Sequence, residues 1–326
     1  MTSSGFSRMR RHALGLGLAL AAGAAFAQDN PIRILVGFAP GGVTDLVARV
    51  LAQGMQAELG RTVVVDNRPG AGGQIAAQAL KVARPDGNTL YLTNSHTTAM
   101  VPLTTLQPGY DATRDFVYVG LVATNPNFFM VNPALVGPGV DSVKAFADWA
   151  RAHPGRGNIG VPAPASAPEF SVSVLGQAYQ ADFKAAAYRG DAPLVQDLIG
   201  GQIPAGIAGI AAALPHVRAG KLKLLAVDGP QRLPGFDVPT YSELGLKGLE
   251  DVITIGLIAP AGTPADLVAK FNAAANKVVA SKTFHDRIVD TGILVKSGTP
   301  DDMLRTTEAS RAASERLVKA AGFKPQ

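Results

Sequence analysis

The sequence predicts an α/β fold in two lobes, with the second lobe inserted into the first. Short apolar runs rich in β-branched residues alternate with amphipathic helical stretches along most of the 326 residues, a pattern typical of α/β units. Strand-like segments interrupt this alternation near 110–131 and near 252–258, and we interpret them as crossings between the lobes. Two crossings would make a two-strand hinge, about which the lobes could close on a ligand.

Residues 1–27 have the features of an export signal. Three arginines precede an apolar stretch at 13–24, and Ala25-Phe26-Ala27 is an A-x-A cleavage site. We therefore expect cleavage after Ala27 and a mature protein in the periplasm. The alternative is an uncleaved anchor, but the apolar stretch is too short to span a membrane. Arg10-Arg11 leaves the choice between Sec and twin-arginine export open.

The composition argues against several classes of protein. With 47% hydrophobic and 17% charged residues, the chain is typical of a well-packed globular protein. The three arginines of the signal leave with it and no acid does, so the formal net charge falls from +5 to +2. This charge gives no support for a nucleic-acid partner. The absence of cysteine excludes thiolate nucleophiles and Fe–S clusters, and we expect no cofactor.

The turn Phe38-Ala39-Pro40-Gly41-Gly42-Val43-Thr44-Asp45 is the strongest candidate for a ligand contact. It follows the apolar run Ile32–Val36, expected to be a strand, and precedes a helix expected to end at Gly60. Its glycines permit a tight turn, and the first amides of a helix readily bind an anion. We expect the amides from Gly41 to Thr44 to be the donors, with Asp45 complementing the helix dipole.

Polar residues also follow the third expected strand. Asn94 and Ser95 come directly after Leu90–Thr93, and in open α/β sheets ligands bind outside the carboxyl ends of the strands. These two residues are therefore expected on the same side of a pocket as the glycine turn.

The inserted lobe offers three further candidates. Ser166 precedes a helix, and Arg189-Gly190-Asp191 follows an expected strand. Ser166 and Asp191 can each be either a helix N-cap or a ligand contact. As a contact, Asp191 would meet an ammonium group. Arg189 is either a clamp for an anion or part of a surface ion pair.

An enzymatic function is the alternative to ligand binding. Ser95-His96 raises the idea of an exported hydrolase, but adjacent residues cannot form a triad by themselves and no G-x-S-x-G motif is present. The histidines of the mature chain, at 96, 153, 216 and 285, lack the spacing of metal ligands. We expect these histidines to be exposed or satisfied, and we expect neither catalysis nor a metal site. The C-terminal helices that start near Thr263 and Thr299, each expected as an N-cap, are expected to be scaffold.

Many short motifs resemble those of the Bug family, the periplasmic solute-binding components of tripartite tricarboxylate transporters, and they occur in the same order as in that family. They cover nearly the whole mature chain. They include Pro31-Ile32-Arg33-Ile34-Leu35-Val36, Phe38-Ala39-Pro40-Gly41-Gly42 with Asp45, Asn67-Arg68-Pro69-Gly70-Ala71-Gly72-Gly73, Pro85-Asp86-Gly87, Tyr110-Asp111, Tyr188-Arg189-Gly190, Gly200-Gly201-Gln202, Val238-Pro239-Thr240 and Ala259-Pro260-Ala261-Gly262-Thr263-Pro264.

This resemblance implies a type II-like periplasmic binding fold. Lobe 1 would comprise 28–127 and 252–326, and lobe 2 would comprise 128–251. The family typically captures small carboxylates, dicarboxylates or aromatic acids. The resemblance implies these ligand-binding residues: Phe38, Ala39, Gly41, Gly42, Thr44, Asn94, Ser95, Ser166, Arg189 and Asp191.

The chain departs from the family pattern on the lobe 2 side. Val161 and Ile203-Pro204 replace polar residues that are frequent in the family, and Thr254-Ile255 replaces a frequent aromatic. These changes favour an acid with an apolar or aromatic body over citrate. We expect a monomer that binds a small carboxylate and delivers it to the membrane subunits of a transporter. The alternative is an orphan sensor that presents its ligand to the periplasmic domain of a sensor kinase.

Overall fold

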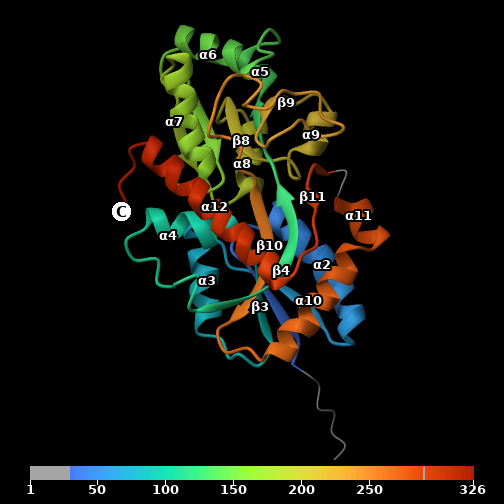
Figure 1. Ribbon diagram of the computed structural model, residues 1–326. Helices are drawn as coiled ribbons and strands as arrows, with labels where there is room; N and C mark the ends of the chain where they lie inside the picture. Colours follow the sequence, from blue (N-terminus) through green and yellow to red (C-terminus); the bar gives the residue numbers. More distant parts are fainter. Residues whose placement is uncertain (1–29, 289–290) are drawn as a thin grey trace, which may run out of the picture. The chain divides into compact units, whose positions relative to one another are not determined.

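The computed structural model describes residues 30–288 and 291–326 (Figure 1). Ile32–Gln326 form one compact unit. The expected export signal and its cleavage site after Ala27 lie outside the described residues. Among the described helices, none combines the length and apolar character needed to cross a membrane.

The first sheet has the strand order β11-β4-β10-β3-β1-β2. β1 pairs in parallel with β2 and β3, whereas β10 runs antiparallel to β3 and β4. Its strands are β1 (Ile32–Val36), β2 (Val63–Asn67), β3 (Thr89–Asn94), β4 (Phe116–Asn125), β10 (Ile253–Pro260) and β11 (Leu294–Val295). The helical segments of this part are α2 (Val43–Leu59), η2 (Ala71–Gly73), α3 (Gln74–Lys81), η3 (His96–Met100), α4 (Val101–Thr104), α10 (Ala265–Val279), α11 (Lys282–Ile288) and α12 (Pro300–Ala320).

The second sheet has the strand order β7-β6-β8-β5-β9. β6 pairs in parallel with β7 and β8, and β5 runs antiparallel to β8 and β9. Its strands are β5 (Asn127–Val131), β6 (Asn158–Val161), β7 (Lys184–Ala187), β8 (Ala205–Gly209) and β9 (Lys223–Val227). The helices of this part are α5 (Pro133–Val136), α6 (Val143–Ala152), α7 (Ala167–Tyr179), α8 (Asp191–Ile199) and α9 (Leu214–Arg218).

Helix α2 shows how the local sequence builds the first lobe. Its apolar face, with Val47, Leu51 and Met55, is fully buried in the core of the first sheet. The helix ends at Gly60, whose left-handed backbone (φ 64°) lets its N–H bond the carbonyl of Gln56. The expected strand, helix and helix end are thus confirmed.

The chain passes between the sheets where β4 leads into β5, and it returns along 228–252 before β10. The two-lobed α/β fold is therefore confirmed. Helix α12 adds a further connection, because it runs from β4 towards α7 (Figure 1). Met303 packs in a first-sheet core and Leu317 in a second-sheet core. Beyond the end of α12, Phe323 contacts Phe170 edge-on, with ring centroids 5.2 Å apart.

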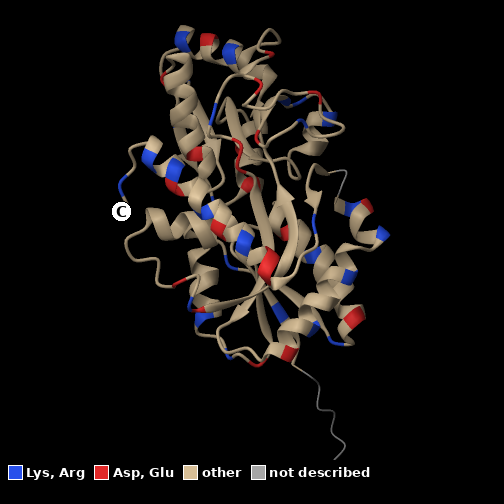
Figure 2. Cartoon of the chain, viewed as in Figure 1, with Lys and Arg blue, Asp and Glu red and all other residues tan. Residues whose placement is uncertain are grey.

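The two C-terminal helices begin differently. Thr299 caps α12 as expected, in a reciprocal capping box with Asp302, and charges of both signs alternate along this helix (Figure 2). The expected N-cap at Thr263 is wrong. Its hydroxyl donates to the carbonyl of Pro260 at 2.8 Å, and Pro264 takes the N-cap position of α10 without a side-chain bond.

Candidate functional site

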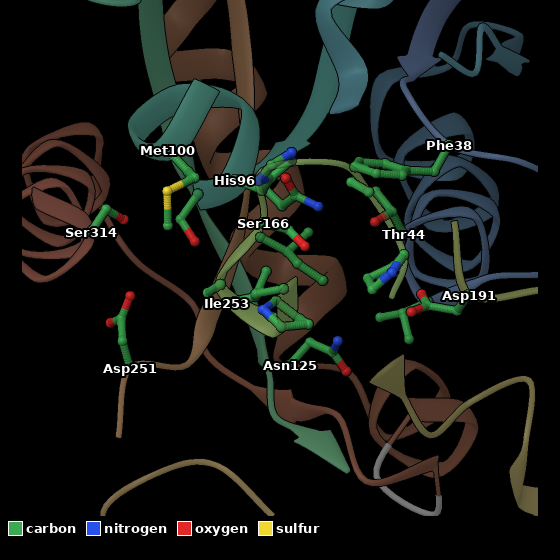
Figure 3. Close-up of a pocket in the computed structure, with 18 residues that line it drawn as sticks. Phe38, Thr44, His96, Met100, Asn125, Ser166, Asp191, Asp251, Ile253 and Ser314 are labelled. Atoms are coloured by element: carbon green, nitrogen blue, oxygen red, sulfur yellow. The ribbon is translucent and has the colours of Figure 1, made fainter. Parts of the chain in front are cut away.

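A cavity of about 40 Å³ lies where the carboxyl ends of β1 and β3 face the loop after β6 and the start of α8 (Figure 3). Both sheets contribute to its walls, as expected for a site between two lobes. Its lining residues are Phe38, Val43, Thr44, Asn94, Ser95, His96, Met100, Asn125, Pro162, Ala163, Ser166, Ala167, Pro168, Asp191, Asp251, Ile253, Ile255 and Ser314.

The structure brings together six of the ten residues that the sequence suggests: Phe38, Thr44, Asn94, Ser95, Ser166 and Asp191. The other four do not line the cavity: Ala39, Gly41, Gly42 and Arg189. Arg189 lines an adjoining pocket to which Phe38 also contributes, and the Ala39 N–H donates to the Arg189 carbonyl at 3.2 Å. That hydrogen bond joins the first-lobe turn directly to the second lobe.

The amide of Gly41 is not available to a ligand in this arrangement, contrary to our expectation. It donates to Asp45 Oδ2 at 2.9 Å. Asp45 also accepts two hydrogen bonds from Arg49, each at 2.9 Å, and one from Asn67 Nδ2 at 2.9 Å. Burial alone would raise the pKa of Asp45, but these hydrogen bonds outweigh burial and lower it. Asp45 therefore holds the shape of the turn.

Replacing Asp45 with Asn is expected to destabilise the protein by about 1–2 kcal/mol, because a buried network loses its charged acceptor. Arg49 is 54% exposed, so the ion pair itself contributes little and the loss comes mainly from the bonds to Gly41 and Asn67. Chemical denaturation would measure the change. Asp66→Asn is the control, since its partner Arg68 is exposed too. Equal stability of the two variants would contradict this role for Asp45.

Asp191 connects the two lobes. Gly190 takes the N-cap position and Asp191 is the first residue of α8, so the N-cap interpretation of Asp191 is wrong. Its carboxylate accepts the N–H of Gly209 at 3.1 Å and lies beside the start of α2, where a Cβ on Gly42 would be 3.5 Å from Asp191 Oδ2. Burial raises the pKa of Asp191 to about 6, although hydrogen bonding to backbone N–H groups acts in the opposite direction. An acid of the second lobe thus occupies the anion-binding end of a first-lobe helix.

Ser166 is the N-cap of α7, and its Oγ accepts the Glu169 N–H at 3.4 Å. The residue is 2% exposed and lines the cavity. The N-cap interpretation is therefore confirmed. Contact between Ser166 and a ligand remains a prediction, and it is compatible with this capping role.

His96 was expected to be exposed or satisfied, and that expectation is wrong. It is 7% exposed, and neither ring nitrogen has a hydrogen-bond partner. Burial lowers the pKa of His96 to about 4, so the ring is neutral at pH 7. Gly72 packs against it: a Cβ on Gly72 would lie 2.4 Å from His96 Nε2. A neutral imidazole without partners can donate one hydrogen bond and accept another.

The pair Ser95–His96 lacks the geometry of an activated nucleophile. Ser95 Oγ accepts the N–H of Thr254 at 3.2 Å, and the His96 ring is unpartnered. A hydrolase would need the serine hydroxyl to donate to the ring.

Several lining residues lie outside the sequence-based candidates. Asn125 ends β4, Asp251 precedes β10 and Ser314 lies on α12. The expectation that the C-terminal helices are scaffold alone is thus wrong for α12. Position at the end of a strand would have been a usable signal for Asn125, whereas Ser314 reaches the cavity only through long-range packing.

Comparisons with known proteins agree with this architecture. The family model described as "Tripartite tricarboxylate transporter family receptor" matches residues 47–323. Protein BugT of Bordetella pertussis is 34% identical, over 83% of this chain and 83% of its own. The periplasmic binding protein BugD has a TM-score of 0.85 and 29% identity, covering 91% of this chain and 99% of its own. An R. palustris protein solved with adipate has a TM-score of 0.85 and 30% identity, covering 92% of this chain and 100% of its own.

The family match covers most of the chain, and the related structures share its two lobes. The chain therefore belongs to the Bug family, the periplasmic solute-binding receptors of tripartite tricarboxylate transporters.

Proposed function

We propose that this protein captures a small organic carboxylate between its lobes in the periplasm and delivers it to the membrane subunits of a tripartite tricarboxylate-type transporter. The observation that carries the proposal is the cavity with walls from both sheets. The related R. palustris protein was solved with adipate, which supports a carboxylate ligand. Cleavage after Ala27 would release the mature protein into the periplasm as a monomer.

The proposed lobes are 28–127 with 252–326, and 128–251. Thr44 would contact the ligand from the first lobe and Ser166 from the second. A ligand held from both sides stabilises the closed state, since the open state offers it half of these contacts. Closure is thus the binding event that the membrane subunits would recognise.

The lining supports a carboxylate with an apolar body. Such a ligand would be a dicarboxylate or an aromatic acid. Phe38, Met100 and Ile253 provide apolar surface (Figure 3). The hydroxyls of Thr44 and Ser166 provide neutral donors for a carboxylate. Neutral donors bind carboxylates well when they are held in place before binding.

Thermal-shift and calorimetric screening would test the proposal. The mature chain should be unfolded and refolded first, to remove any ligand that co-purifies. We expect at least one mono- or dicarboxylate to raise the melting temperature by several degrees, because a ligand that binds the folded state stabilises it. If none of these acids stabilises the refolded protein, the proposed ligand class is wrong.

Ser166→Ala should weaken binding of the carboxylate found by that screen about tenfold, which corresponds to the loss of one hydrogen bond to a charged group. Ser142→Ala is the matched control. Ser142 caps α6 through the Ala145 N–H at 3.1 Å and is absent from the cavity lining. Each variant loses an N-cap and about 1 kcal/mol of stability. Equal affinity of both variants for the ligand would exclude Ser166 from the site.

A further inference from the structure

A groove lies on the second lobe, outside the cavity between the lobes. Its volume is about 710 Å³, against about 40 Å³ for that cavity. Helix α9, the start of strand β9 and the segment 234–238 form its walls. Its lining residues are Leu214, Val217, Arg218, Leu222, Lys223, Leu224, Pro234, Gly235, Phe236, Asp237 and Val238. None of them lines the cavity, so the groove is a separate feature of the surface.

The groove has apolar surface that its own lobe does not cover. The side chains of Val217, Leu224 and Phe236 pack against the core beneath α8, but each is only partly buried. Phe236 is held in place by Phe128, with ring centroids 5.0 Å apart. Removing such apolar surface from water is favourable, so a partner that covers it gains free energy of binding.

Two basic side chains of the groove lack an acidic partner. Neither Arg218 nor Lys223 forms an ion pair or a side-chain hydrogen bond among the residues that the structure describes. The one acid of the lining, Asp237, has its own cation: its Oδ1 lies 3.4 Å from Nη1 of Arg232, which does not line the groove. The groove therefore favours a partner with negative charge.

The groove also lies at an incompletely paired edge of the second sheet. β9 is the last strand of that sheet and pairs with β5 on one side. On its other side, the Val227 N–H donates to the Pro239 carbonyl at 3.0 Å, and the Val227 carbonyl accepts the Tyr241 N–H at 3.1 Å. Within the described part of the chain, no strand or bridge pairs with this side of Lys223–Ala226. An edge strand of this kind can pair with an added extended segment.

We infer that this groove is a docking site for an extended segment of a partner protein in which acidic and apolar side chains alternate. The backbone of the segment pairs with Lys223–Ala226. Successive side chains of a strand point to opposite faces, so the segment places acids beside Lys223 and apolar side chains beside Leu224 and Phe236. Arg218 adds positive charge at the wall.

A second copy of this chain does not fit the same edge, because pairing two such edges brings the Lys223 side chains of both copies together. The inference concerns a surface outside the cavity between the lobes. It therefore goes beyond the proposed function and does not depend on which carboxylate that cavity binds.

Three short peptides of equal length test the inference on the mature chain. In one peptide Leu and Glu alternate, in the second Leu and Lys alternate, and in the third all Leu residues precede all Glu residues. We expect the alternating Leu–Glu peptide to bind about tenfold or more tightly than the other two and to shift the NMR amide signals of Lys223–Ala226. No binding, or equal binding of either other peptide, overturns the inference. If decanoate shifts these signals as strongly, the groove binds small amphipathic acids and the inference is also overturned.

Charge substitutions test the assigned position. The double variant Arg218→Gln with Lys223→Gln should lower the affinity for the alternating Leu–Glu peptide about tenfold. Lys221→Gln is the matched control, because Lys221 is an exposed cation between these two residues in the chain and does not line the groove. Equal losses per charge removed would show attraction to the surface as a whole and overturn this position. The comparison of peptides on the unmodified protein does not depend on whether the variants fold.

Discussion

Gly72→Ala is expected to weaken ligand binding by about tenfold or more and to destabilise the protein by about 3 kcal/mol. Gly72 has a left-handed backbone (φ 63°) and lies against the buried ring of His96. An added Cβ would be 2.4 Å from His96 Nε2 and 3.1 Å from its Cδ2, so the ring must move. Because His96 is part of the cavity wall, its movement changes the site as well as the fold.

Gly60→Ala separates the two effects. Gly60 has almost the same backbone (φ 64°), but a Cβ there meets nothing within 4 Å. The Gly60→Ala substitution should therefore lower the free energy of unfolding by about 1 kcal/mol, the strain of a left-handed alanine. It should leave the affinity for the ligand unchanged. Chemical denaturation measures the change in stability. Calorimetry with the carboxylate found by the thermal-shift screen measures the change in affinity. If Gly72→Ala behaves like Gly60→Ala in both, His96 is neither tightly packed nor important for binding.

The second large effect is the pH dependence of stability that Asp191 causes. Burial raises its pKa from 3.8 to about 6. Between these values the folded protein binds a proton that the unfolded chain has released, so stability falls as the pH rises through this window. Well below pH 3.8 the carboxyl is neutral in both states and the penalty is absent; well above pH 6 the penalty is complete. The shift from 3.8 to about 6 makes the complete penalty about 3 kcal/mol, of which about 2 kcal/mol develops between pH 4.5 and pH 7.5.

Asp191→Asn should remove this penalty. The free energy of unfolding of the unmodified protein, compared between pH 4.5 and pH 7.5, should fall by about 2 kcal/mol more than that of the variant. Asp251 also has a pKa raised to about 6 by burial, but it is present in both proteins and cancels in the difference. Asp197→Asn serves as the control on the same helix. A pH profile of Asp191→Asn that parallels the unmodified protein would show that Asp191 ionises without cost.

Local patterns in the sequence were sufficient for the elements of the fold. The apolar run before the glycine turn forms β1. The next stretch, with its apolar face and its terminal glycine, forms α2. Such elements are encoded by periodicity and by glycine and cap residues close in the chain. Thr263 failed as a cap although its motif resembles that of Thr299, because Pro264 adopted an extended backbone and the helix started one residue later.

The site was less predictable, because its hydrogen bonds join residues far apart in the chain. The Gly41 amide looked free, but Asp45 folds back four residues to bind it. Asp191 looked like a cap, but its position beside Gly42 depends on how the lobes meet. No local pattern distinguishes His96 from a satisfied histidine. Its burial beside Gly72 follows from the packing of η3 against η2.

The position of α12 has a consequence for the speed of ligand uptake. Its first part packs with the first sheet, while Leu317 and the nearby Phe323 belong to the core of the second. Opening the lobes must therefore bend this helix or uncover those apolar side chains, which costs free energy. We expect this brace to lower the fraction of unliganded receptor that is open. We accordingly expect ligand association to be limited by the rate of opening and to be much slower than diffusional encounter.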